Sequence, residues 1–138
     1  MALKKKQILQ HIATKLEIKV KGTKDPLDLN YLTDIKQLAR DINAVHISDH
    51  LCWTTHNQLN SHDLLPMPYT AEAVQHIAKR ICQTQDFLEQ AILVENVSSY
   101  LNYSSSELSE WGFINAILAE SNCLLLLDVN NVYVNSVN

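Results

Sequence analysis

The feature that most constrains the fold is an unbroken apolar segment, residues 123–127, which ends at the carboxylate of Asp128. A strand without polar side chains on either face is typical of a parallel sheet that is covered on both sides. Two further strand-like segments with β-branched residues, 44–48 and 91–95, precede it, and helical patterns separate the three. This alternation predicts an α/β fold with parallel strands and right-handed crossovers.

Four segments carry apolar residues at helical spacing. They predict helices over 3–18, 28–42, 71–89 and 109–121. Thr70 and Ser109 are the expected N-caps of the last two helices. In the last helix the pattern predicts a buried stripe of Trp111, Ile114, Ile117 and Leu118.

Residues 49–69 have no helical or strand pattern and are expected to form a long loop. Loops of this length inside a compact domain are usually functional or disordered. Because Trp53 and Tyr69 lie in this segment, we expect an ordered loop with a functional role.

Charge is distributed unevenly along the chain. Residues 1–24 contain seven Lys and one Glu, whereas the remainder contains four basic and fourteen acidic residues. The basic segment lacks Arg and interleaved aromatic residues, which favours a solvated helix, and the acidic remainder argues against nucleic-acid binding. There is no apolar run of membrane-spanning length, and three widely spaced cysteines indicate free thiols in a reducing compartment. We expect a cytoplasmic protein that binds neither nucleic acid nor membrane.

Each predicted strand leads into a side chain that is able to bind a metal. These side chains are His50, Glu95 and Asp128, with Asn131 shortly after the last. In parallel α/β folds the carboxyl ends of the strands converge on one face, where sites are built. Imidazole and carboxylate groups without thiolates suit iron, manganese or zinc. The sequence therefore predicts a metal site at this edge.

Structural roles for the same side chains remain open from the residues alone. Glu95 is equally compatible with a structural role. Asp128 is also compatible with a turn in which its carboxylate accepts hydrogen bonds from the following backbone. His46 is expected to pack within its strand. His56 and His62 either line a pocket or face water.

Four motifs resemble those of a known family, the multinuclear non-haem iron-dependent oxidative enzymes of the methanobactin-biosynthesis type, long catalogued as domain of unknown function 692. The motifs are SDHLCW at 48–53, HDLLPMPYT at 62–70, LVENVSSY at 93–100 and LLDVNNVYV at 126–134. They occur in the order and spacing of the family.

The resemblance implies a xylose-isomerase-like TIM (β/α) barrel that holds two or three iron ions. It further implies oxidative modification of cysteines in ribosomally made peptides with dioxygen, and a separate partner protein that recognises the leader peptide. By motif, His50, Glu95 and Asp128 match metal-ligand positions, and Asn131 is a weaker candidate. The expected substrate-binding residues are Trp53, His56, His62 and Tyr69.

The chain also departs from the pattern of this family. A full barrel takes about 250 residues, so residues 26–138 are expected to form a partial barrel with three or four of eight strands. Residues 1–25 are expected to be a basic extension that is not family-like, since 15–21 lacks the family's His-Gly-Val-type motif. The chain is thus expected to be inactive alone and to pair with a complementing fragment or a second copy. The alternatives are a non-catalytic remnant or assembly module, and a metal-dependent barrel resembling sugar isomerases or nucleases.

Overall fold

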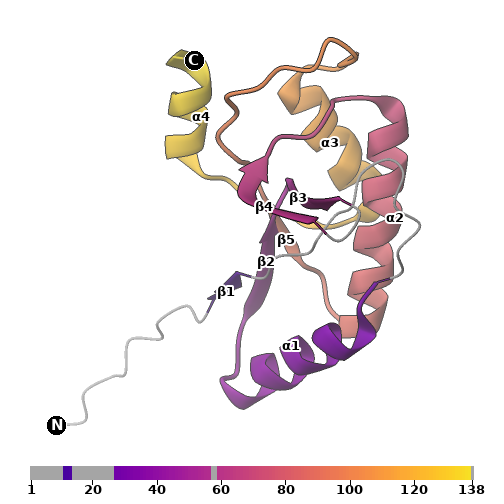
Figure 1. Ribbon diagram of the computed structural model, residues 1–138. Helices are drawn as coiled ribbons and strands as arrows, with labels where there is room; N and C mark the ends of the chain where they lie inside the picture. The colour runs from indigo at the N-terminus through magenta and orange to yellow at the C-terminus, as the bar shows by residue number, and fades with distance from the viewer. Residues whose placement is uncertain (1–10, 14–26, 57–58, 138) are drawn as a thin grey trace, which may run out of the picture.

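A four-stranded parallel sheet forms the centre of the molecule. The computed structural model (Figure 1) describes residues 11–13, 27–56 and 59–137, with side chains described for 27–53 and 63–137. The spatial order of the strands follows their order along the chain: β1 (His11–Ala13), β2 (His46–His50), β5 (Leu93–Glu95) and β6 (Leu124–Leu126). Every neighbouring pair is parallel. The predicted α/β fold with parallel strands is therefore confirmed.

Three helices connect these strands and begin where the sequence predicts. They are α1 (Leu29–Asp41), α2 (Ala71–Leu88) and α3 (Glu110–Ser121). Thr70 and Ser109 are confirmed as N-caps, because their side chains accept hydrogen bonds from the backbone N–H groups of Ala73 and Gly112 at 3.2 and 3.1 Å. Among the described residues, no helix is both long and apolar enough to cross a bilayer.

The helices cover one face of the sheet. Because successive strand side chains point to opposite faces, Ile47 and Val94 point to the helices, where they join a core with Ile77, Phe113 and Ile117. The opposite face carries His50, Leu93 and Glu95, which are only partly buried. The pleat thus separates a packed face from a face with polar side chains at its carboxyl end.

Several predictions about local structure are wrong. The helix expected over 3–18 is contradicted at His11–Ala13, which pair with β2 as a strand, and the rest of that segment lies outside the described residues. The segment 49–69 is not a continuous loop, because β3 (Trp53–His56) and β4 (Leu59–Leu65) form an antiparallel hairpin. Trp111 is 41% exposed, and Phe113 is buried in its place.

A fourth helix, α4 (Val129–Val137), follows the last strand and was not predicted. In Figure 1 it stands apart from α1, α2 and α3, beyond the carboxyl end of the sheet. It has no buried residue. Its sequence, VNNVYVNSV, is rich in residues of low helix propensity, which is why the pattern did not reveal it.

Candidate metal centre

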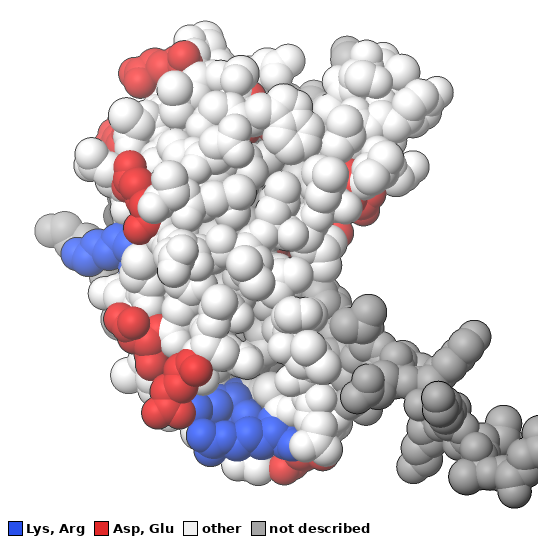
Figure 2. Space-filling model, turned by 180° about the vertical axis from the view of Figure 1, so that it is seen from behind, with Lys and Arg blue, Asp and Glu red and all other residues white. Residues whose placement is uncertain are grey.

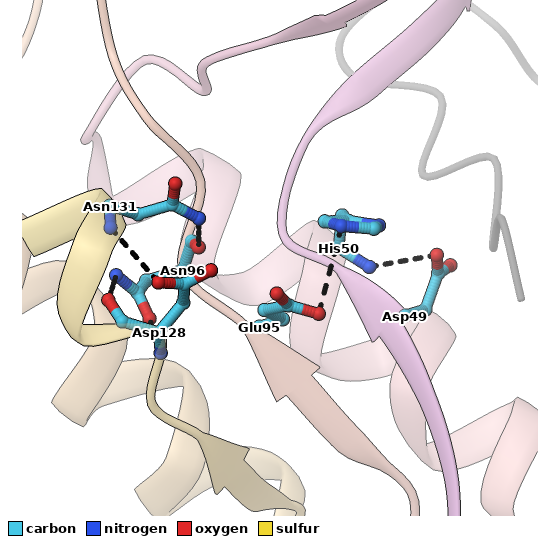
Figure 3. A network of polar contacts seen from close by, with 6 residues as sticks. All are labelled: Asp49, His50, Glu95, Asn96, Asp128 and Asn131. Carbon is cyan, nitrogen blue, oxygen red and sulfur yellow. Dashed lines mark hydrogen bonds and ion pairs between the residues drawn. The ribbon is translucent and has the colours of Figure 1, made fainter. Parts of the chain in front are cut away.

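His50 and Glu95 form a pair at the carboxyl end of the sheet. They are the last residues of β2 and β5, and they lie opposite each other in the parallel register. The imidazole Nε2 of His50 lies 3.6 Å from Oε2 of Glu95, and their side chains are 26% and 15% exposed. Figure 3 shows the two side chains facing each other across neighbouring strands. The sequence predicted that His50, Glu95 and Asp128 converge at one edge, and this distance shows the contact for His50 and Glu95.

The backbone around the pair is held by two hydrogen bonds. Asp49 is buried, and its Oδ1 accepts a hydrogen bond from the backbone N–H of His50 at 2.8 Å. Beyond the strand, the N–H of Leu51 donates to the carbonyl of Glu95, also at 2.8 Å. The first contact is local to β2, and the second joins the chain after β2 to the end of β5 at the point where the side chains meet.

Asp128 belongs to a second polar group on the other side of Glu95, together with Asn96 and Asn131 (Figure 3). Asn96 is buried and bonds the backbone of Asp128 twice: it accepts from the N–H at 2.7 Å and donates to the carbonyl at 3.0 Å. The Asp128 carboxylate accepts from the backbone N–H of Asn131 at 3.0 Å. Asn131 Nδ2 donates to the Asn96 carbonyl at 2.8 Å. Asp128 therefore acts as the N-cap of α4.

This arrangement agrees only partly with a metal centre. A histidine nitrogen and a carboxylate oxygen are suitable donors for iron, manganese or zinc. However, in the described part of the chain no three His, Cys, Asp or Glu side chains are close enough to hold one ion together. The pair supplies two donors, and the role of Asp128 and Asn131 as metal ligands remains a prediction.

Two of the four predicted substrate-binding residues, Trp53 and Tyr69, have described side chains. Trp53 donates a hydrogen bond from Nε1 to the hydroxyl of Tyr103 at 3.1 Å, which ties the hairpin to the segment between β5 and α3. Tyr69 packs against Phe113 with ring centroids 4.9 Å apart. The side chains of His56 and His62 lie outside the described residues. The substrate role of all four stays a prediction.

A cavity of about 360 Å³ lies beside this region, and of its lining residues only Tyr69 was predicted from the sequence as a substrate-binding residue. Tyr69, Ser99, Glu110 and Asn135 contribute to its wall. Asn135 lies on α4, the helix that was not predicted. Glu110 lies in the first turn of a predicted helix, where acidic residues are common. We call this cavity the Glu110 pocket.

Burial shifts the pKa values of two groups in the Glu110 pocket. It raises the pKa of the Glu110 carboxyl above its ordinary value, although the hydrogen bond from Asn135 opposes the shift. Burial, followed by the charge of Glu110, raises the pKa of Tyr69 to about 12. At neutral pH Tyr69 therefore keeps its proton. The ionised carboxylate of Glu110 lowers the stability of the folded state.

We expect the substitution Glu110→Gln to raise the melting temperature at pH 7, with the gain disappearing at about pH 4. A carboxyl whose pKa is raised by folding contributes stability below its unfolded pKa, and this is lost as the pH rises through the folded pKa. Gln keeps an acceptor for Asn135 without the charge. Thermal unfolding at the two pH values checks this, with Glu120→Gln on the exposed end of α3 as the control. Equal melting temperatures for Glu110→Gln and the wild type at pH 7 would contradict the assignment.

The fold and the site together define a class: an α/β domain with a histidine–carboxylate pair where its parallel strands end. Residues 4–138 match the family described as RiPP precursor modification enzyme MbnB/TglH/ChrH, and the chain belongs to this family. RiPPs are ribosomally made, post-translationally modified peptides. The motif-based prediction of the family is thereby confirmed.

Curated relatives are similar in sequence but considerably longer. A UPF0276 protein of Acaryochloris marina is 50% identical over 117 residues, which are 85% of this chain and 42% of the relative. A UPF0276 protein of Anaeromyxobacter is 45% identical over 85% of this chain and 41% of its own length. One from Pasteurella multocida is 48% identical over 119 residues, 85% of this chain and 38% of the relative. The chain thus spans less than half the length of these relatives.

Proposed function

We propose that this chain carries part of the metal-binding edge of an iron-dependent enzyme that oxidatively modifies cysteines in ribosomally made peptides. The observation that carries the proposal is the contact of His50 Nε2 with Glu95 Oε2 in a member of a peptide-modifying family. When bound, iron would supply one-electron and dioxygen chemistry, which protein side chains lack.

The architecture proposed for the complete enzyme is a TIM (β/α) barrel, of which this chain forms a part. Two features support it. The strands follow one another in space as they do along the chain, whereas a doubly wound sheet reverses its strand order. The helix-free face carries His50, Leu93 and Glu95, the face that points inward in a barrel.

Each residue of the edge has a separate proposed task. His50 and Glu95 would hold iron, Glu95 from β5, which lies between β2 and β6. Asp128 and Asn131 are proposed as further ligands. In that role the Asp128 carboxylate would either bind the ion while it keeps the hydrogen bond from the Asn131 N–H, or give that hydrogen bond up. The hairpin of β3 and β4 and Tyr69 would shape the entrance for the peptide. A partner protein that recognises the leader peptide is proposed from the family.

The proposal predicts weak iron binding that depends on the pair. Because two donors leave an ion under-coordinated, we expect a low affinity for Fe²⁺ in the wild-type chain. His50→Ala and Glu95→Gln should each lower that affinity by at least about tenfold, since even residues that only support ligands contribute this much. Anaerobic equilibrium dialysis with iron analysis measures it.

Asp86→Asn, an exposed substitution on α2, is the matched control and should bind iron like the wild type. Equal Fe²⁺ affinity in the wild type, His50→Ala and Glu95→Gln would overturn the proposal that His50 and Glu95 bind the metal. The non-catalytic alternative makes a different prediction. A non-catalytic assembly module should bind no iron in this dialysis while still associating with another chain, so iron content measured together with the oligomeric state separates the two proposals.

A further inference from the structure

The Glu110 pocket has a rigid polar wall. Asn135 Nδ2 donates to Glu110 Oε1 at 2.9 Å and to the carbonyl of Val97 at 3.1 Å. The Oδ1 atom of Asn135 accepts from the backbone N–H of Ser99 at 2.5 Å. One amide therefore fixes the carboxylate on α3 to the segment that follows β5. A prearranged site of this kind loses little conformational entropy when a ligand binds.

The backbone of Tyr69 holds a further part of the wall. Its carbonyl accepts hydrogen bonds from the N–H groups of Glu107 and Leu108 at 2.9 and 3.0 Å, and its N–H donates to Ser106 Oγ at 3.1 Å. The Tyr69 hydroxyl is hydrogen-bonded to the side chain of Ser99. Every residue that lines the cavity except Leu108 has a side chain with a polar group, and the volume of about 360 Å³ is within the range of small-ligand sites.

Glu110 lacks a cationic partner within the part of the chain that the structure describes. Asn135 bonds one carboxylate oxygen, and no described residue donates to the other, Oε2. Residues 41–78 and 81–138 contain no Lys or Arg at all, while 81–138 contain seven Asp or Glu. In Figure 2 the basic side chains of this face lie mainly at the end of the molecule that carries α1, opposite to the strand carboxyl ends. The pocket is therefore electronegative.

We propose that the Glu110 pocket binds a primary ammonium group, with the carboxylate of Glu110 as its counter-ion. An ammonium group donates three hydrogen bonds and accepts none, which matches a wall of carboxylate, hydroxyl and amide oxygens. An anion is a poor occupant, because Glu110 is a carboxylate and no Lys or Arg is among the described residues that line the cavity. A metal ion is a poor occupant, because Glu110 is the single carboxylate among the residues that line the cavity.

The position of the pocket relates it to the metal edge. Ser99 lies four residues after Glu95, and four residues of extended chain span at most about 14 Å. The identity of the ligand as part of a peptide rests on the proposed function. If the ligand is a peptide, the ammonium belongs to one of its lysine side chains or to its N-terminus. The cysteine of this peptide would then lie a few residues away, at His50 and Glu95. The pocket would then fix the register of the peptide.

The test uses three small probes without cysteine and without iron, so that its outcome is independent of iron binding and peptide modification. Nα-acetyl-lysine methylamide carries the ammonium on a side chain, alanine methylamide carries it on the α-nitrogen, and Nα-acetyl-norleucine methylamide is the uncharged match. Ligand-observed NMR titrations at pH 7 with the full chain measure the affinities. A charge-assisted hydrogen bond predicts that an ammonium probe binds about tenfold or more tightly than the norleucine probe.

The variants locate the binding site. Glu110→Gln should remove the preference for the ammonium probe, and Glu120→Gln at the other end of α3 should keep it. The tighter of the two ammonium probes identifies the source as a lysine side chain or a peptide N-terminus. Equal binding of the lysine, alanine and norleucine probes to the wild type overturns the proposal without any variant. A preference that survives in folded Glu110→Gln, checked by circular dichroism, also overturns it.

Discussion

Purified alone, the 138-residue chain is expected to self-associate at micromolar concentration. Large apolar side chains at the end of the chain are about half exposed or more, namely Leu124, Leu127, Val129, Tyr133 and Val137. Three of these, Val129, Tyr133 and Val137, are spaced by four residues and form a single stripe on α4. Exposed apolar surface of this extent on a soluble protein marks a contact site or promotes aggregation.

The magnitude of the effect follows from the exposed area. Fully burying such side chains is worth about 1.5–3 kcal/mol each, so burying the exposed parts of all five is worth about 5 kcal/mol. That is comparable to the net stability of a small domain. In addition, β6 pairs only with β5 among the described strands, and an unpaired strand edge favours association with another chain.

Sedimentation with thermal unfolding checks this prediction. The wild-type chain should sediment well above its monomer mass of 15.7 kDa. The double substitution Val129→Lys with Val137→Lys should shift the population toward monomer, whereas Thr33→Lys, exposed on α1, should leave it unchanged. A wild-type monomer that melts cooperatively above about 50 °C, as mesophilic domains do, would contradict the prediction.

Asn96→Leu is expected to destabilise the fold by about 3 kcal/mol and to lower the melting temperature by about 10 °C. The side chain is buried and bonds both the N–H and the carbonyl of Asp128. Leucine fills a similar volume but leaves both backbone groups without their partner. After loss of this contact, α4 is held to the segment that follows β5, in the described part of the chain, only by the hydrogen bonds of Asn131 and Asn135.

Thermal unfolding at one protein concentration measures the effect, because association itself shifts the melting temperature. Asn115→Leu, exposed on α3, is the matched control and should change stability by less than about 0.5 kcal/mol. A melting temperature of Asn96→Leu close to that of the control would show that this asparagine does not hold β5 and α4 together.

The fold was predictable from the sequence wherever periodicity and capping agree. The apolar run before Asp128 and the Thr70 and Ser109 caps predicted the parallel sheet and two helix starts, and all are present. The pattern failed where tertiary contacts decide the structure. The hairpin of β3 and β4 contains a β-bulge or irregularity and little alternation, and α4 begins at a cap formed by Asp128 in a segment of weak helix formers.

The candidate site was predictable only in part for a related reason. His50 and Glu95 end adjacent parallel strands, so their convergence follows from the strand order. The Asp128 carboxylate could be placed at the correct end of the sheet, and the structural alternative, in which it accepts a hydrogen bond from the following backbone, agrees with its bond to the N–H of Asn131. The Glu110 pocket depends on an asparagine of the unpredicted helix and on a carboxylate in a first helical turn, and no local pattern links two such residues.

Iron-directed backbone cleavage tests for a metal centre at the carboxyl end of the sheet, because it locates a bound ion even in an associated chain. Fe²⁺ is bound at low concentration, ascorbate and peroxide are added, and the fragments are identified by mass spectrometry. The account predicts cuts that cluster near His50, Glu95 and Asp128 and that disappear in Glu95→Gln. Cuts that cluster instead at the α1 end of the molecule, or that persist unchanged in Glu95→Gln, would contradict a metal centre at the carboxyl end of the sheet.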